Sequence, residues 1–225
     1  KKILYIAQEI TPYLDETPMG SFARLLPQIV QEAGDDVRVF MPKYGTINER
    51  RHQLHEVIRL SGMNLVINDV DMPLIVKVAS IQKERMQVYF IDNDEYFKQE
   101  DAFDDQGKLY ADNDERCIFF AKGIIETVKK LNWSPDLIHI QGWLGALLPL
   151  YLRTYYKDEP IFYNTKTITC FLRSPFEGQL DAALLSKVGF DEITEKEAEE
   201  LKEPHSLNLI KIASRYSDAI TTVKG

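Results

Sequence analysis

Residues 2–7 read KILYIA and residues 37–41 read VRVFM, and these two β-branched and aromatic runs predict buried strands. Between them, apolar residues recur at the spacing of one helix face: Phe22, Leu25, Leu26, Ile29 and Val30. Gly34 follows, where a helix commonly ends. A strand, a helix and a second strand form a βαβ unit, which belongs to a parallel sheet. The opening of the chain therefore predicts a Rossmann-like fold.

The rest of the chain continues this pattern with insertions. Residues 56–93 form short alternating stretches that predict inserted β-hairpins, and residues 94–107 predict an acidic surface loop. We expect helices at residues 112–131, 146–155 and 206–216, and strands at residues 136–140, 161–164 and 218–223. Residues 165–203 are the least regular stretch and predict a lid or a long insertion.

Together these elements predict an α/β fold with a doubly wound, mainly parallel Rossmann-like sheet. Residues 3–6, 37–40 and 137–139 lack polar alternation, as strands covered on both faces do. We therefore expect them to be neighbouring buried strands.

Composition excludes several classes of protein. Of 225 residues, 44% are hydrophobic and 28% charged, which is typical of a globular domain. The net charge of −8 disfavours nucleic acid as a partner, because such binding depends on clustered Lys and Arg. Cys117 and Cys170 show no CxxC or Cys/His spacing, so we expect no disulfide framework and no metal site. No leader precedes the first strand and no apolar run approaches the ~20 residues of a membrane span, so we expect a cytoplasmic protein without a membrane partner.

The candidate ligand-binding loops follow the expected parallel strands, because ligands in such sheets bind beyond the carboxyl ends of the strands. Gly20 and Ser21 begin a helix whose free N–H groups suit a phosphate or a sugar hydroxyl, although an ordinary helix start has the same pattern. His139, Gln141 and Trp143 lie at a strand end. They are either ligand contacts, with Trp143 as a stacking surface for a sugar, or core residues. We expect all five to converge around one opening.

Four segments extend this interpretation. They are KILYIAQEITPYL with the following DETPMGSFARLLP (residues 2–27), DVRVFMPKYG (36–45), LYADNDERCIFFAKGIIETV (109–128) and DLIHIQGWLGALLPLYLR (136–153). In this order they resemble the KTGGLADVVGALP, PxYG, YxDNxxRFxxFxxA and DVVHxHDWHTALxPxYL segments of bacterial glycogen and starch synthases. These are family 5-like glycosyltransferases of the GT-B fold, which has two Rossmann-like domains.

The resemblance implies a function. The family transfers glucose from ADP-glucose to the nonreducing end of an α-1,4-glucan without a metal, and its C-terminal domain binds most of the nucleotide. We therefore expect residues 1–225 to form a single N-terminal, acceptor-side domain, with the C-terminal donor-binding domain absent from the chain. The implied partners are an α-glucan and ADP-glucose, and no cofactor is expected.

The departures from the family pattern are concentrated in its ligand-binding loops. Asp15 stands where the family has a lysine that contacts the phosphates, and a carboxylate repels a phosphate at short range. Thr17 and Pro18 replace paired glycines, and Ser21 replaces an acceptor-side Asp. These changes predict weakened binding of the nucleotide sugar.

The later motifs depart in the same way. His139 and Trp143 are kept, but the family's His-Asp before the Trp and His after it become Gln141, Gly142 and Leu144. The next strand end carries a Thr-Ile-His-Asn motif in the family, and we place it over residues 163–166, so that Thr165 occupies the active-site His position.

Three interpretations remain open at this point. The first is a synthase-like glucosyltransferase domain that is impaired or inactive as an isolated chain. The second is a non-catalytic module that binds a glucan or regulates a protein partner through the former acceptor cleft. The third is an unrelated nucleotide- or sugar-binding α/β domain, which requires the ordered matches to be coincidental.

Overall fold

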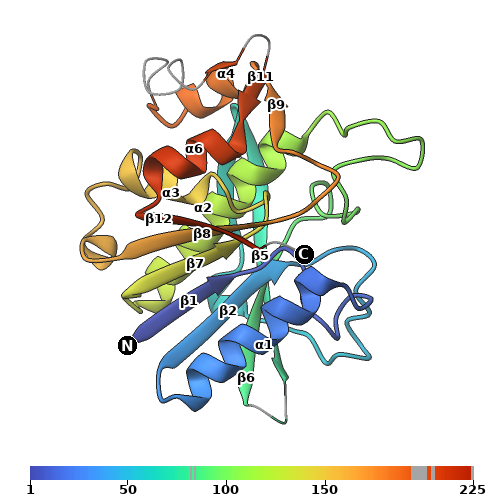
Figure 1. The fold of residues 1–225 in the computed structure, drawn as a ribbon, viewed down its shortest axis with the longest axis vertical. Helices are drawn as coiled ribbons and strands as arrows, with labels where there is room; N and C mark the ends of the chain where they lie inside the picture. The colour runs from blue at the N-terminus through green and yellow to red at the C-terminus, as the bar shows by residue number, and fades with distance from the viewer. Residues whose placement is uncertain (82, 84, 194–201, 204–205, 224–225) are drawn as a thin grey trace.

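The fold is a large, mostly parallel sheet with helices on both faces (Figure 1). The computed structural model describes residues 1–81, 83, 85–193, 202–203 and 206–223. Within these residues the sheet has nine strands in the order β12-β8-β7-β1-β2-β6-β5-β3, with β4 paired to β5. Pairing is parallel from β12 to β6 and antiparallel beyond it. A second, antiparallel sheet has the order β10-β11-β9.

The strands are β1 (Lys2–Ile6), β2 (Asp36–Pro42), β3 (His55–Glu56), β4 (Met63–Ile67), β5 (Val70–Ile81), β6 (Met86–Asp92), β7 (Leu137–Gln141), β8 (Lys166–Leu172), β9 (Gln179–Asp181), β10 (Lys202–Glu203), β11 (Ser206–Asn208) and β12 (Ala219–Val223). The helices are α1 (Pro18–Glu32), α2 (Asn113–Leu131), α3 (Leu148–Arg153), α4 (Leu184–Gly189) and α6 (Leu209–Tyr216), with 3₁₀ turns η1 (Ile58–Leu60) and η2 (Pro160–Phe162).

The three strands predicted to be neighbours lie side by side in the centre of the sheet. Tyr5 of β1 pairs with Val39 of β2 on one side and with His139 of β7 on the other, both in parallel register. Leu4 and Ile6 are buried, as is Ile140 of β7. The doubly wound, mainly parallel sheet is therefore confirmed.

Local sequence explains where the two longest helices begin and end. Thr17 caps α1 by accepting a hydrogen bond from the Gly20 N–H at 2.9 Å, and Pro18 fits the first turn, where no N–H is needed. Gly34 follows with a φ of +104°, as the sequence predicted. Helix α2 ends at Asn132 in the left-handed conformation, with Lys129 and Lys130 in its last turn.

The predicted hairpins are present between β2 and α2. Strands β4 and β5 pair around Asn68 and Asp69, which both have positive φ values, as tight hairpin turns require. Strand β5 pairs in turn with β6, and β6 returns to the sheet parallel to β2. The hairpins thus extend one edge of the sheet, while residues 94–107 form only turns and a single bridge, from Phe103 to Leu109.

Three sequence predictions need correction. The strand expected at residues 161–164 is wrong: Pro160–Phe162 form a 3₁₀ turn, and the strand is β8, starting at Lys166. The helix expected at 146–155 is shorter, and the one expected at 206–216 starts at Leu209, after a short strand. Asn208 caps this helix, because its side chain accepts from the N–H groups of Ile210 and Lys211 in the first turn.

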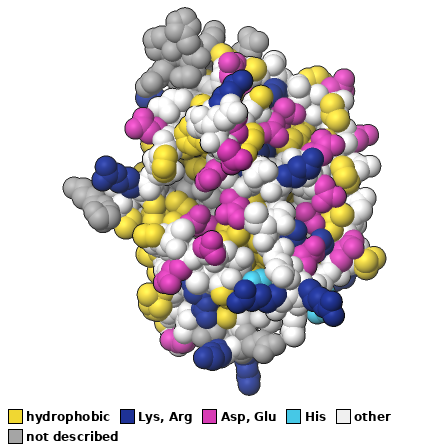
Figure 2. All heavy atoms as spheres, turned by 90° about the vertical axis from the view of Figure 1, so that its right-hand side faces the viewer, with side chains coloured by type: hydrophobic (Ala, Val, Ile, Leu, Met, Phe, Trp, Pro, Cys, Tyr) yellow, Lys and Arg dark blue, Asp and Glu magenta, His cyan; other side chains and the backbone are white. Residues whose placement is uncertain are grey.

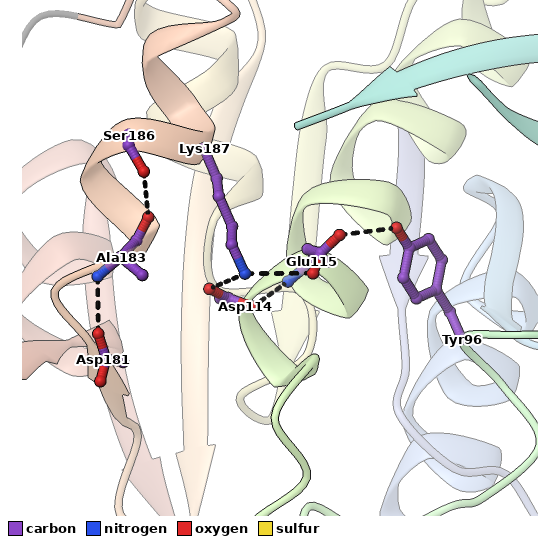
Figure 3. A network of polar contacts seen from close by, with 7 residues as sticks. All are labelled: Tyr96, Asp114, Glu115, Asp181, Ala183, Ser186 and Lys187. Atoms are coloured by element: carbon purple, nitrogen blue, oxygen red, sulfur yellow. Dashed lines mark hydrogen bonds and ion pairs between the residues drawn. The ribbon is translucent and has the colours of Figure 1, made fainter. Parts of the chain in front are cut away.

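Residues 165–203, predicted as an irregular lid or a long insertion, contain the regular elements β8, β9 and α4. Residues 194–201 lie outside the described residues. Polar contacts fasten α4 to α2 (Figure 3). The Lys187 ammonium lies 2.8 Å from the Asp114 carboxylate and 3.1 Å from that of Glu115, which also accepts from the Tyr96 hydroxyl at 3.3 Å. These bonds fix the insertion against the N-terminal end of α2.

Candidate functional site

A cleft opens at the edge of the sheet where the parallel strands end. It consists of two adjoining cavities of about 570 and 400 Å³, within the usual ~300–1,000 Å³ of small-molecule sites. The larger lies among the loop after β1, the start of α1 and residues 101–103; the smaller lies among the loops after β7 and β8 and the start of α6. Figure 2 views the molecule from this side and shows acidic side chains spread among hydrophobic ones.

The side chain of Gln8 joins the loops after β1 and β7. Its Oε1 accepts hydrogen bonds from the backbone N–H groups of Trp143 at 3.0 Å and Leu144 at 3.2 Å. Gly142 makes this approach possible, because its φ is +84° and a Cβ there would lie 2.4 Å from the Gln8 Oε1. The buried Tyr44 hydroxyl donates to the Gln8 carbonyl at 2.8 Å, and burial raises its pKa. The loops that bound the cleft are therefore held in one arrangement.

Trp143 forms part of the wall of both cavities and is only 5% exposed. The guanidinium of Arg116 lies 5.6 Å from its ring centroid, and the ring of Phe176 meets it nearly edge-on, with centroids 4.9 Å apart and planes at 74°. Both contacts are of the kind that stabilises aromatic side chains. Trp143 thus packs between a buried cation and a second ring.

Arg116 also positions the acidic loop that closes the larger cavity. It is 1% exposed and donates to the backbone carbonyl oxygens of Gln99 and Asp101, each at 2.8 Å, and to the Asn113 side chain at 3.0 Å. Its Nε has no partner in the described part of the chain. Hydrogen bonds from a charged donor are stronger than neutral ones, so Arg116 fixes the wall that carries Asp101.

The charges around the cleft are mostly negative. Glu9 and Asp101 line the larger cavity and Glu177 the smaller, while Arg173 lines both. The Thr17 hydroxyl donates to the Glu9 carboxylate and thereby ties the loop after β1 to the start of α1. Carboxylates accept hydrogen bonds from hydroxyl groups and repel phosphates. The cleft therefore suits a neutral, hydroxyl-rich ligand better than a diphosphate.

A family model described as the starch synthase catalytic domain matches residues 2–224. The chain belongs to the starch synthase catalytic domain family. This confirms the family inferred from the ordered sequence segments.

Curated relatives of this synthase-family domain are named glycogen synthases. That of Chlorobium limicola is 33% identical over 223 residues, covering 98% of this chain and 45% of the relative. That of Chlorobium chlorochromatii is 40% identical over 173 residues, covering 74% and 35%. The catalytic domain of starch synthase IV from Arabidopsis thaliana bound to ADP and acarbose has a TM-score of 0.81, covers 99% of this chain and 45% of that one, and at 18% identity shows the shared fold. The chain thus spans less than half the length of these relatives.

In this synthase-family domain, the two loops predicted to converge do so, because Met19 and Trp143 line the same cavities. Of the five predicted substrate-binding residues, only Trp143 is among the lining residues. Gly20 is buried, and a Cβ on it would lie 3.1 Å from the Thr11 hydroxyl oxygen. The Ser21 hydroxyl faces the Glu16 carboxylate at 3.3 Å instead.

His139 and Gln141 lie deeper in the sheet than expected of ligand contacts. The His139 ring packs against Tyr5 with centroids 5.3 Å apart, and burial lowers its pKa from the ordinary value of 6.5. Gln141 is 2% exposed. The His139 Nδ1 and the Gln141 Oε1 are buried atoms without a partner in the described part of the chain. Their positions agree with the alternative of core residues, although each retains unused hydrogen-bonding capacity.

The two positions aligned with family catalytic residues also lie outside the cleft. Asp15 is exposed and is not a lining residue. Thr165 precedes β8 and donates to the Pro135 carbonyl at 2.6 Å, at the opposite edge of the sheet from the cleft, so its placement at a strand end is wrong. Because β8 ends at Leu172, the strand end reads Thr169-Cys170-Phe171-Leu172.

Sequence reasoning missed most residues of the cleft, among them Phe103, Arg173 and Phe176. These three depend on the position of β8 or on the packing of the acidic loop. The β-branched run from Thr165 to Thr169 was the signal that could have located β8, and Pro160 in the preceding turn marks a break before it.

Neither a metal site nor a membrane span emerges from the described residues. They include no cluster of three or more His, Cys, Asp or Glu side chains that could hold a metal ion. No helix among them is both long enough and apolar enough to cross a bilayer.

Proposed function

We propose that this domain binds an α-glucan in the cleft at the strand ends, as the acceptor-side part of a synthase-like glucosyltransferase. We further propose that it does not transfer glucose from ADP-glucose on its own. Its curated relatives are named glycogen synthases, and its structural neighbour is bound to ADP and acarbose. The chain spans 45% of the length of these two proteins. Glucosyl transfer by a longer protein that contains this domain is therefore proposed as well.

The observation that carries the proposal is the chemistry of the cleft wall. The larger cavity is lined by the aromatic rings of Phe103, Trp143 and Phe176 and also by the acidic residues Glu9 and Asp101. Apolar ring surfaces suit the carbon-bound hydrogens of a sugar, and carboxylates accept hydrogen bonds from its hydroxyl groups. The same carboxylates disfavour the diphosphate of ADP-glucose.

Loss of transfer activity follows from the positions that depart from the family. Asp15 stands where the family has a lysine that contacts the phosphates of the nucleotide sugar. Exchanging an attractive ammonium for a repulsive carboxylate weakens the binding of a diphosphate at this position. Incubation with labelled ADP-glucose and glycogen tests this directly. Turnover near that of a full-length synthase would refute the proposed inactivity.

Binding is tested by titration calorimetry of the domain with maltooligosaccharides and, separately, with ADP-glucose. We expect Asp101→Asn to weaken oligosaccharide binding about tenfold, because a charged hydrogen bond contributes about 1.5 kcal/mol or more. Asp105→Asn is the matched control, since it neutralises the same acidic loop outside both cavities. Equal affinities of the two variants would contradict binding in this cleft.

Trp143→Ala is a poor test of sugar stacking. The side chain is 5% exposed and packed between Arg116 and Phe176, so its truncation would cost ~3–5 kcal/mol of stability. Conservative changes at the exposed carboxylates separate binding from folding more cleanly.

The second candidate function is a non-catalytic module that regulates a protein partner through the same cleft. Asp15, at a position where the family has a lysine that contacts the phosphates, favours it. If calorimetry detects neither oligosaccharide nor nucleotide binding, this alternative takes the place of the glucan-binding proposal.

A further inference from the structure

We propose that Phe176 divides the cleft and thereby sets how many glucosyl units of an α-glucan it holds; this inference rests on the proposed glucan binding. The two cavities share one set of wall residues: Met19, Trp143, Leu172, Arg173, Ser174 and Phe176. The shared residues lie between the larger and the smaller cavity. A ligand that extends from one cavity into the other therefore passes this wall of shared residues.

The ring of Phe176 is held in this wall by contacts with two other aromatic rings. It meets Trp143 at 4.9 Å between centroids and Phe103 at 6.1 Å, in both cases nearly edge-on. Phe103 lines the larger cavity but not the smaller one. The rings of Phe103, Phe176 and Trp143 therefore lead from the larger cavity to the residues that both cavities share. Phe176 is 7% exposed and Trp143 5%, and the contact between the two rings covers part of each. Removing the Phe176 ring would uncover the part of Trp143 that it contacts.

The backbone that carries Phe176 is anchored by hydrogen bonds that do not involve its ring. Its own N–H donates only to the hydroxyl of Ser174, at 3.3 Å. Gly178, with a φ of +87°, accepts a bond at its carbonyl from the Leu209 N–H at 2.9 Å. Figure 1 shows this segment running from the end of β8 to β9 on the side where the parallel strands end. The side chain can therefore be shortened while the flanking anchor remains.

The smaller cavity has the chemistry to receive more of the same ligand. Glu177, Gln179 and Asn208 line it and supply a carboxylate and two amides, which accept from or donate to sugar hydroxyls. Its other walls include the apolar side chains of Phe171 and Ile210. A glucan that ends against Phe176 in the natural protein would thus find a suitable path beyond it once the ring is removed.

The wall is tested first without any ligand. In a Trp133→Phe background, Trp143 is the remaining tryptophan, and its quenching by acrylamide measures its exposure. Phe176→Ala should increase that quenching. Phe190→Ala, which removes an exposed ring outside both cavities, should leave it unchanged. Unchanged quenching in Phe176→Ala would refute the proposal that Phe176 covers Trp143 between the two cavities.

The ligand test compares maltooligosaccharides from maltotriose to maltoheptaose by calorimetry. In the natural chain, affinity should stop rising once the larger cavity is filled. In Phe176→Ala it should keep rising with length, ending about two- to tenfold higher for the longest ligand, as expected for one additional hydrogen bond between the smaller cavity and a sugar hydroxyl. Phe176→Leu keeps an apolar side chain in case the alanine variant folds poorly, and should show the same trend more weakly.

The outcomes separate this inference from the function on which it rests. If the natural chain binds no oligosaccharide at all, the proposed function fails and the inference fails with it. If both proteins bind with the same dependence on chain length, glucan binding stands and the role of Phe176 is overturned.

Discussion

Gly142→Ala tests how tightly the cleft is held together. The substitution adds one methyl group at the end of β7, at a residue with a φ of +84°. The new Cβ would lie 2.4 Å from the Gln8 Oε1, well inside van der Waals contact. Gln8 must then withdraw from the N–H groups of Trp143 and Leu144, to which it is bonded at 3.0 and 3.2 Å.

Two costs add at this position. Holding a residue with a Cβ in the left-handed region costs about 1–2 kcal/mol. Loss of the two hydrogen bonds from Gln8 costs about 0.5–1.5 kcal/mol each. We therefore expect Gly142→Ala to lower the free energy of unfolding by about 2–5 kcal/mol, which corresponds to a fall in Tm of roughly 2–4 °C per kcal/mol for a domain of this size.

Two other glycines separate these costs. Gly34 also has a positive φ, of +104°, but a Cβ there would meet nothing within 4 Å, so Gly34→Ala should show the backbone cost alone. Gly189 is the last residue of α4, has no such φ and is equally open, so Gly189→Ala should be neutral or stabilise by about 0.5–1 kcal/mol. Urea denaturation followed by circular dichroism measures all three. The reasoning about Gln8 is refuted if Gly142→Ala loses no more stability than Gly34→Ala.

Three further predictions concern stability, each measured by urea denaturation. Asp191→Asn should cost about 3–5 kcal/mol, because it leaves the Lys122 ammonium, 2.6 Å away and 6% exposed, buried without its counter-charge; a double Lys122→Met, Asp191→Leu variant as unstable as the single one would contradict this. Burial lowers the pKa of His139 from 6.5, so protonation favours the unfolded chain and stability falls as the pH drops below about 6.5. His139→Gln should reduce this loss of stability at low pH. An unaltered pH dependence would contradict its attribution to His139. Asn208→Ala should cost about 1 kcal/mol by removing the cap of α6, whereas an unchanged midpoint would show the cap to be dispensable.

The central sheet could be predicted because its strands have strong local signals. The runs around Leu4, Val39 and Ile138 are mostly apolar, which suits strands covered on both faces, and Gly34 marks the end of the helix between the first two. The strand β8 was missed because the apolar residues before it, around Phe162, imitate a strand. In the structure Pro160 begins a 3₁₀ turn there, and the polar Thr167 and Thr169 are the buried strand residues.

The candidate site was harder to predict than the fold. Trp143 was identified because it follows a recognisable strand, and it does line the cleft. His139 and Gln141 carry the same sequence signal, but they belong to β7 itself rather than to the loop after it, and the packing of the sheet buries Gln141 almost completely. Two positions along the chain thus separate a wall residue from a core residue.

What the sequence determined by itself is the opening strand-helix-strand unit, the parallel centre of the sheet and the family, because these follow from local periodicity and from ordered motifs. Only the tertiary structure decided the contents of the cleft. Phe103, Trp143 and Phe176 are distant in sequence and meet because Arg116 fixes the acidic loop and β8 ends at Leu172. Such contacts depend on packing between loops, for which a single sequence has no period to read.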